Sequence, residues 1–557
     1  MKYDVKLLVL LLSTVNVFGQ TNLDHFKVPI TIPLKVSGSF GELRPNHFHS
    51  GIDFTSNYKI GDPVFAPEDG VVNRIKVSSF GYGKALYLKH PNGYTTVYGH
   101  LNAYLQKIDT YVKDKQYTAK QFEIELFPLA TELVVKKGDI IGYIGNTGGS
   151  GGPHLHYEFR DTNTEEIINP LTLSLLNDVV DIEQPIINSL FVYPLTKETV
   201  VNNETTFFEV ALNKRNNKYL SNTILTNGSI GFGINTHDTQ NGSRGKNGVY
   251  RITTYLNGSK YYEVVFDRFS FNESSVINHY IDYKYYKLSG NRVQKLFIVN
   301  DLPLSLIKHE KNKGIVTLNP EEDAIFKIEV ADAHGNIQTI EIPLKYSESV
   351  VKNIKEPTGK HIDYLKDYAF QNENVSVEWD ARTFFEDVNL DLQLQKDKVV
   401  LHKDEFAVQK NISIKFLVDT DFPNKDKTFI GLKMGNKMKY YDTWKRENDF
   451  RIRTKELGTY ELVTDLDPPT IQLLSAKNVF SQADEIVLEI EDQLSGIGSF
   501  NGYLNQEWIL FDYDYKTKKI IHKLTDKKYK VGQNTLRVEV VDRVGNNTTF
   551  EQTIIIN

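Results

Sequence analysis

The chain of 557 residues contains no cysteine. This absence excludes disulfides, thiolate catalysis, cysteine-ligated zinc and a lipid anchor on cysteine, so any bound metal must use histidine and carboxylate ligands. Basic residues are not in excess either, because 65 Lys and Arg face 71 Asp and Glu and the formal net charge is −6. The sequence also has no basic stripe interleaved with aromatic residues. We therefore expect no nucleic-acid partner.

Methionine and tryptophan are scarce, with three residues each, whereas Tyr and Phe number 31 each. Together with frequent Thr, Val and Ile alternation, this composition favours strands over helices. Long apolar runs are also missing. Residues 7–12 are apolar, follow Lys2 and Lys6, and precede the small residue Gly19. This pattern is typical of a secretory signal over residues 1–19.

The signal predicts a mature protein that begins near Gln20 and is exported to the periplasm, the cell envelope or the medium. The competing interpretation is a buried N-terminal helix, but the apolar run is too short to span a bilayer and polar residues follow at once. Since no other segment of the sequence reaches transmembrane length, we expect a mature chain without a transmembrane segment.

The length predicts several domains rather than one core. We expect an all-β dominated chain, in which a small antiparallel β domain at residues 20–180 precedes two or three β-sandwich domains. A repeat supports this division, because E-V-A-D-A-H-G-N at 329–336 matches E-V-V-D-R-V-G-N at 539–546. The repeat predicts two immunoglobulin-like β modules, at 181–346 with an insertion near 270–315 and at 466–557. Strand-like runs predict a third β-sandwich, of uncertain type, at 347–465.

The densest chemistry lies at residues 148–159, which read G-G-S-G-G-P-H-L-H-Y-E-F. Residues 155–159 alternate as a strand does, and side chains two apart on a strand share a face. His154 and His156 are therefore expected to point the same way. That placement allows one imidazole to bind a metal while the other acts beside it.

A second motif, H-S-G-I-D, places His49 and Asp53 four residues apart. On a straight strand they would lie about 13 Å apart at ~3.3 Å per residue. Zinc ligands need bonds of about 2 Å, so the chain must bend, and Gly51 permits the bend. With His156 as a third ligand, two histidines and one carboxylate leave a fourth position for water, which is a catalytic zinc arrangement.

His100, at the end of a strand over 94–100, and His154 remain for acid–base chemistry. The motifs H-x-G-x-D at 49–53, Y-G-H-L at 98–101, G-N-T-G at 145–148 and G-P-H-L-H-Y-E at 152–158 resemble, in order, those of lysostaphin/LytM-type zinc endopeptidases, metallopeptidase family twenty-three. The resemblance covers about residues 40–172. It implies one Zn²⁺ bound by His49, Asp53 and His156, catalysis by His100 and His154, and the peptide part of peptidoglycan as substrate.

Three other interpretations compete with this one. The run at 148–152 matches G-x-S-x-G, but a serine hydrolase needs a strand-to-helix elbow there, and Pro153 with a strand follows instead. The chain could be a catalytically inactive LytM-type regulator that activates another cell-wall hydrolase, although such domains typically lose ligands. It could also be an adhesive scaffold whose β modules bind the cell wall or protein partners. Dependence on metal separates the enzyme from the last two.

Relatives commonly lack the polar insertion at residues 105–132, which follows His100. We expect a helix over about 118–124 and an alternating stretch through Phe122, Ile124 and Leu126 that covers a sheet edge. The insertion is either a wall of the groove or a surface feature without a role. We also expect the β modules to be dispensable for the chemistry, so that residues 20–180 suffice.

Overall fold

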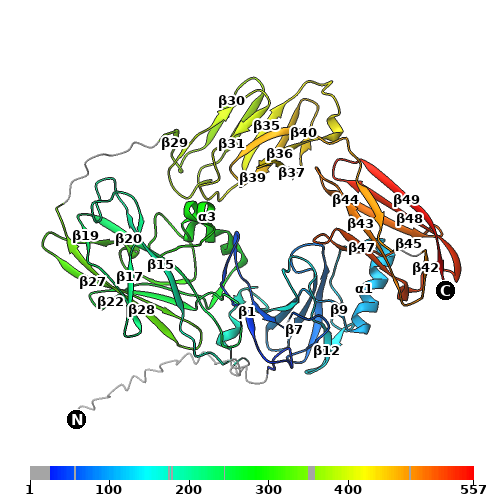
Figure 1. Ribbon diagram of the computed structural model, residues 1–557, viewed down its shortest axis with the longest axis horizontal. Helices are drawn as coiled ribbons and strands as arrows, with labels where there is room; N and C mark the ends of the chain where they lie inside the picture. The colour runs from blue at the N-terminus through cyan, green and yellow to red at the C-terminus, as the bar shows by residue number, and fades with distance from the viewer. Residues whose placement is uncertain are drawn as a thin grey trace, which may run out of the picture.

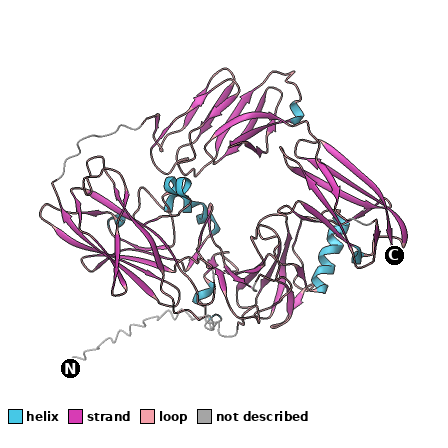
Figure 2. Cartoon of the chain, in the orientation of Figure 1, coloured by secondary structure: helices cyan, strands magenta, loops and turns pink. Residues whose placement is uncertain are grey.

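The computed structural model describes residues 26–557 except 56–57, 174–175, 177–179, 244, 349–357 and 476–477. The predicted signal segment lies outside the described residues. The chain is all-β with many antiparallel sheets, which confirms the predicted fold class. Figure 2 shows strands in every part of the chain and only a few helices. No described helix combines the length and apolar character needed to cross a bilayer.

The N-terminal unit, residues 26–172, is built on one large antiparallel sheet. Its strands run in the order β1 (Val36–Gly38), β4 (Ile52–Thr55), β13 (His154–Asp161), β8 (Tyr94–Gly99), β7 (Lys84–Lys89), β6 (Gly70–Val77) and β10 (Ile124–Leu126), with β11 (Val134–Val135) on β6 and β14 (Ile167–Ile168) on β13. The unit also contains a second sheet and a hairpin. The second sheet runs β5 (Pro63–Phe65), β12 (Ile140–Tyr143) and β9 (Ala103–Tyr104), and the hairpin consists of β2 (Leu43–Arg44) and β3 (His47–Phe48). The 3₁₀ helix η1 (Pro170–Thr172) closes the unit.

The insertion after His100 forms helix α1 (Gln106–Ala119) and the edge strand β10. The helix expected over 118–124 is therefore wrong in position, because the segment turns helical earlier. Its buried face repeats every four residues at Ile108, Val112 and Gln116, and the polar third member weakens the apolar signal. The expected edge strand is confirmed, since β10 pairs with β6.

The first module, residues 186–346, holds two sheets. One runs β16 (Phe208–Glu209), β15 (Ile186–Pro194), β20 (Ser229–His237), β24 (Gln294–Lys295), with β26 (Val316–Thr317) on β20. The other runs β17 (Leu212–Arg215), β18 (Lys218–Ser221), β28 (Ile337–Tyr346), β27 (Asp323–Ala331), β21 (Arg251–Leu256), β22 (Ser259–Val265), β25 (Ile307–Glu310), with β19 (Ile224–Thr226) on β28. The region of the predicted insertion contains β23 (Arg268–Phe269), η3 (Phe271–Val276), α2 (Ile277–Tyr280), α3 (Tyr283–Ser289) and η4 (Asn312–Gly314).

The N-terminal unit and the first module share one hydrophobic core. Strand β14 pairs with β23 across the junction, placing Ile167 opposite Phe269. The Phe269 ring lies 5.0 Å from that of Phe40 and 5.6 Å from that of Phe48. The boundary expected near residue 180 stays a prediction, but a fragment of residues 20–180 would expose the Phe40 and Phe48 rings to water. The expectation that such a fragment suffices for the chemistry therefore lacks structural support.

Two further units have cores of their own. The middle unit contains β29 (Lys360–Ile362) with β32 (Val388–Leu390); β30 (Tyr368–Gln371), β31 (Val375–Trp379), β35 (Ile412–Leu417), β39 (Asp449–Thr454) and β38 (Trp444–Lys445); β33 (Gln393–Leu394), β34 (Lys398–Val400), β40 (Thr459–Thr464), β36 (Thr428–Met434) and β37 (Lys437–Tyr441); and η5 (Lys425–Lys427). The C-terminal module contains β41 (Thr470–Leu473), β43 (Glu485–Glu491), β47 (Lys519–Lys523) and β46 (Asp512–Asp514); β42 (Val479–Phe480), β49 (Asn547–Ile556), β48 (Gly532–Asp542), β44 (Ile497–Leu504) and β45 (Glu507–Ile509); and η6 (Leu524–Asp526).

The four units close into a ring, in which the C-terminal module returns to helix α1 of the N-terminal unit (Figure 1). Polar contacts hold each junction along the chain. Tyr283 of the first module donates a hydrogen bond to Asp404 of the middle unit at 2.9 Å, and Lys427 of the middle unit donates to the carbonyl of Val544 at 3.1 Å. The ring closes where Lys113 of α1 lies 2.9 Å from Asp526.

Candidate metal centre and active site

Three neighbouring antiparallel strands, β4, β13 and β8, carry most of the site. Asp53 on β4 lies directly opposite His156 on β13, and His156 in turn lies opposite Gly99 at the end of β8. His100 follows Gly99 and therefore lies just beyond the last paired residue of β8, beside His154 and His156. Its φ of 61° is a left-handed conformation that few non-glycine residues adopt, and it turns the chain sharply at the site.

His49, Asp53 and His156 converge as the sequence predicts. Asp53 Oδ1 lies 3.1 Å from His49 Nε2 and 2.9 Å from His156 Nδ1, and the two nitrogens are 3.1 Å apart. Ligand atoms around a tetrahedral zinc ion with bonds of ~2.0–2.1 Å lie about 3.3 Å from one another, so the triangle has the right size. All three side chains are buried.

The bend between His49 and Asp53 has a different cause from the one expected. Gly51 does not adopt a left-handed conformation. A Cβ atom at Gly51 would instead lie 2.3 Å from the carbonyl oxygen of Tyr157, so only glycine allows this segment to lie against β13. The close approach brings both ends of the H-x-G-x-D motif to His156.

Hydrogen bonds on the far side of each ring set the tautomers of the two histidine ligands. His49 Nδ1 donates to the carbonyl of Ser39 at 2.8 Å, and His156 Nε2 donates to Glu158 Oε1 at 2.9 Å. Each ring thereby directs an unprotonated nitrogen at the centre, as metal ligation requires. The three residues thus fit a metal ion.

Asp53 is held in place from behind. Its Oδ2 accepts a hydrogen bond from Arg44 at 2.6 Å, which leaves Oδ1 facing the two histidines. Burial opposes its ionisation, but the neighbouring imidazoles of His49, His154 and His156 hold the pKa of Asp53 well below its usual value. Asp53 therefore carries a negative charge at the centre.

Glu158 is a site residue to which the sequence motifs assigned no role. Its side chain is fully buried, and besides His156 it accepts hydrogen bonds from Ser50 Oγ at 2.5 Å, from the Tyr82 hydroxyl and from Arg160 Nε at 2.7 Å. Burial opposes the charge, but Arg160 and His156 hold the pKa of Glu158 below its usual value. The signal was present in the sequence, since residue 158 shares a strand face with residue 156.

His100 and His154 lie beside the centre, with ring centroids 4.8 Å apart. His154 Nδ1 donates to the carbonyl of Gly152 at 2.8 Å, and His100 Nδ1 donates to that of Thr147 at 2.8 Å. His154 Nε2 is buried, has no hydrogen-bond partner among the described residues and lies 3.5 Å from Asp53 Oδ1. Burial, together with His154 and His156, lowers the pKa of His100 to about 3, so it is neutral near pH 7.

The C-terminal module contacts the loop that leads to His154. Lys516 Nζ donates to the carbonyls of Asn146 at 2.5 Å and Ser150 at 3.2 Å. The adjacent Tyr515 ring packs on Phe80 with centroids 4.5 Å apart. No local sequence signal could have revealed this contact, because 370 residues separate Lys516 from Asn146.

The insertion provides the second half of that interface. On α1, Lys113 and the Tyr117 hydroxyl both bind Asp526 at 2.9 Å, and the Tyr117 ring packs edge-on against Trp508. The insertion therefore binds the C-terminal module. Neither of the two expectations for this segment included that role.

Comparison with known proteins agrees with this geometry. Residues 47–125 and 123–170 match the family model described as peptidase family M23, and residues 359–465 match a Zu5-like domain. The N-terminal unit therefore contains a peptidase family M23 domain of the LytM/lysostaphin type. The Zu5-like match assigns a type to the middle unit, which the sequence patterns left open.

Individual relatives match the same region. The DD-carboxypeptidase/endopeptidase Mpg of Neisseria meningitidis is 32% identical over 27% of this chain and 29% of its own length. The peptidoglycan DD-endopeptidase ShyC of Vibrio cholerae is 34% identical over 29% of this chain and 33% of its own length. The solved catalytic domain of lysostaphin from Staphylococcus simulans is 26% identical, with 25% of this chain and 90% of that chain covered and a TM-score of 0.19. The chain spans a third or less of the length of the two curated relatives.

Proposed function

We propose that the chain is a zinc-dependent endopeptidase that hydrolyses peptide cross-links of bacterial peptidoglycan. One observation carries this proposal: two imidazoles and a carboxylate converge on a point, with two further imidazoles beside them. The family match and the name of Mpg, a DD-carboxypeptidase/endopeptidase, support a peptidase, and the name of ShyC, a peptidoglycan DD-endopeptidase, supports peptidoglycan as the substrate.

His49, Asp53 and His156 would hold the zinc ion. When bound there, zinc lowers the pKa of a coordinated water towards about 7 and polarises the scissile carbonyl. The remaining steps belong to the chain. His154 Nε2, which has no other partner among the described residues, accepts the proton of the attacking water. The leaving amine takes up the proton that His154 has accepted, either from His154 itself or by way of His100, whose ring centroid lies 4.8 Å from that of His154. In its protonated form His100 would also stabilise the developing oxyanion.

The inactive-regulator interpretation is less well supported, because all five expected residues are present and assembled. The scaffold interpretation remains compatible with the β modules, for which cell-wall or protein partners are part of the proposal. We further propose that the protein acts outside the cytoplasm, on the basis of the basic and apolar pattern of residues 1–19. Retention of Met1 in the exported protein, found by N-terminal sequencing, would count against a mature chain that begins near Gln20, and recovery of the protein only from the cytoplasm would count against this location.

The test is digestion of purified peptidoglycan by the full-length chain, with mass spectrometry of the products. His156→Ala should lose both bound zinc and hydrolysis, since it removes a ligand. His154→Ala should keep the metal and lose at least ~10²-fold in rate, as expected when a general base is removed. Equal loss of metal in both variants would show that the roles are misassigned. A wild type that holds zinc but releases no peptide would favour the regulator.

A further inference from the structure

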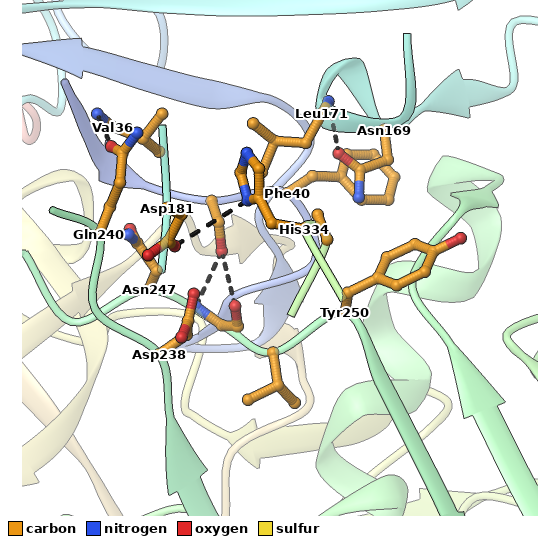
Figure 3. Close-up of a pocket in the computed structure, with 14 residues that line it drawn as sticks. Val36, Phe40, Asn169, Leu171, Asp181, Asp238, Gln240, Asn247, Tyr250 and His334 are labelled. Atoms are coloured by element: carbon orange, nitrogen blue, oxygen red, sulfur yellow. Dashed lines mark hydrogen bonds and ion pairs between the residues drawn. The ribbon is translucent and has the colours of Figure 1, made fainter. Parts of the chain in front are cut away.

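A small cavity lies where the first module meets the N-terminal unit, and neither Asp53 nor any of the four site histidines lines it. Its volume is about 20 Å³, enough for a single water or ion. Figure 3 shows the polar side chains of Asp181, Asp238, Asn247 and His334 around it, together with Val36 and Phe40 of the N-terminal unit.

Acidic groups from three separate segments meet at this cavity. Asp181 precedes β15, Asp238 follows β20, and Asp332 follows β27. The ligand atoms of Asp181, Asp332 and His334 all lie within 4.8 Å of one another. Two oxygens on opposite sides of a calcium ion lie about 4.6–5.2 Å apart, because each bond is 2.3–2.6 Å long. The cluster therefore has the dimensions of a cation site.

Two unpartnered oxygens give an independent indication of a ligand. Asp238 Oδ1 and Asn247 Oδ1 are buried and have no hydrogen-bond partner among the described residues, on side chains that are only 6% and 4% exposed. Mutual backbone hydrogen bonds of 2.8 Å fix the two residues side by side. A buried oxygen without a partner is costly, and two of them lining one polar cavity call for a positively charged or donating occupant.

The electrostatic surroundings also favour a cation. Burial, with repulsion from Asp181 and Asp332, raises the pKa of Asp238 to about 8. None of the main influences on this carboxyl is a Lys or Arg side chain. A bound divalent cation would supply the missing positive charge.

We propose that this cavity is a binding site for one calcium-type divalent cation. The ligands are the carboxylates of Asp181 and Asp238 and the amide oxygen of Asn247, which line the cavity. Asp332, whose carboxylate accepts hydrogen bonds from His334 and Asn336, adds negative charge beside them. Hard oxygen donors of this kind prefer calcium to zinc. Gln240 beside the cavity accepts a hydrogen bond of 2.6 Å from the backbone of Val36, which is the first residue of β1. An ion in the cavity would therefore help to hold the first module against β1 of the N-terminal unit.

The C-terminal module provides an internal control. Asp465, Asp492 and Asp542 occupy the equivalent positions, before β41, after β43 and at the end of β48, and they also cluster within 4.8 Å. Backbone amides bind Asp542 there as they bind Asp332 in the first module. The difference lies at Asp492, the counterpart of Asp238, because Asp492 Oδ1 accepts hydrogen bonds from Leu494 N at 3.2 Å and Gly496 N at 2.5 Å. We propose no ion at that cluster.

Calorimetric titration of calcium into the full-length chain, freed of calcium but holding its zinc, tests the proposal. The wild type should bind one calcium ion and its melting temperature should rise. Asp238→Asn keeps the shape of the side chain and removes one charge, so it should weaken calcium binding at least ~10-fold. Calcium should no longer raise the melting temperature of this variant. In calcium-free buffer its melting temperature should not be lower than that of the wild type. The matched variant Asp492→Asn should bind calcium like the wild type.

Three results would overturn the proposal. One is a wild type that binds no calcium at millimolar concentration. Another is an Asp238→Asn variant with unchanged affinity. The third uses separate titrations with magnesium and zinc chlorides: a response to zinc alone at this site, abolished by His334→Ala, would replace the calcium assignment with a transition-metal site. Since the readouts are binding and melting, failure of the proposed peptidase activity would not affect them.

Discussion

Replacing Glu158 by Gln should weaken zinc binding although Glu158 is not itself a ligand. The carboxylate is 0% exposed and accepts the Nε2 proton of His156 at 2.9 Å on one oxygen and Arg160 Nε at 2.7 Å on the other. Glutamine has the same shape, but one of its two terminal groups is a donor. Either His156 or Arg160 must therefore face an NH₂ group that cannot accept its hydrogen.

The expected size of the effect follows from which partner is lost. If His156 loses its acceptor, zinc affinity should fall about 10- to 100-fold, equivalent to about 1.4–2.7 kcal/mol. If Arg160 loses its counter-charge, the buried guanidinium should cost about 3–5 kcal/mol of folding free energy. The first outcome is measured by competition with a chromophoric zinc chelator and the second by denaturant unfolding of the metal-free protein.

Glu165 offers a matched control on the same arginine. It lies 3.2 Å from Arg160 Nη1 but is 61% exposed, so Glu165→Gln should change stability by less than ~0.5 kcal/mol and leave zinc affinity unaltered. A folded Glu158→Gln variant with the stability and zinc affinity of the wild type would refute the reasoning that Glu158 orients His156.

Three further outcomes are expected. Lys516→Ala should speed amide hydrogen exchange across residues 145–152 without loss of zinc, because it removes the two hydrogen bonds to that loop; unchanged exchange would contradict this. Asp526→Ala should detach the C-terminal module from Lys113 and Tyr117. Small-angle scattering would register this as a larger maximum dimension. An identical scattering curve would show that other contacts hold the C-terminal module in place. Burial and Lys295 lower the pKa of His279 to about 3, so below pH 6.5 the unfolded chain binds more protons than the folded chain. The free energy of unfolding should therefore fall on acidification, by about 2 kcal/mol at pH 5 from this residue. His279→Gln should lose that share of the pH dependence, and an unaltered pH profile would assign the dependence to other groups.

The residues that gather at the candidate metal centre could be predicted from the sequence alone. The alternation after Gly152 places His154, His156 and Glu158 on one strand face, and the motifs at 49–53, 98–101 and 152–158 supply all five residues that the structure brings together. These features are local: a side chain's direction on a strand depends only on its position, and glycine marks where the chain must lie close to another strand. Strand-rich composition likewise predicted the fold class, because it reflects many short segments at once.

Only the tertiary structure decided which groups surround that centre and which units touch it. The carbonyl of Ser39 and the guanidinium of Arg44 orient the ligands, and neither belongs to a recognisable motif. The shared core across Phe48 and Phe269, and the contact of Lys516 with the loop before His154, join residues far apart in the chain. Such contacts leave no periodic trace in the sequence, since each depends on how whole sheets pack rather than on the pattern within any one of them.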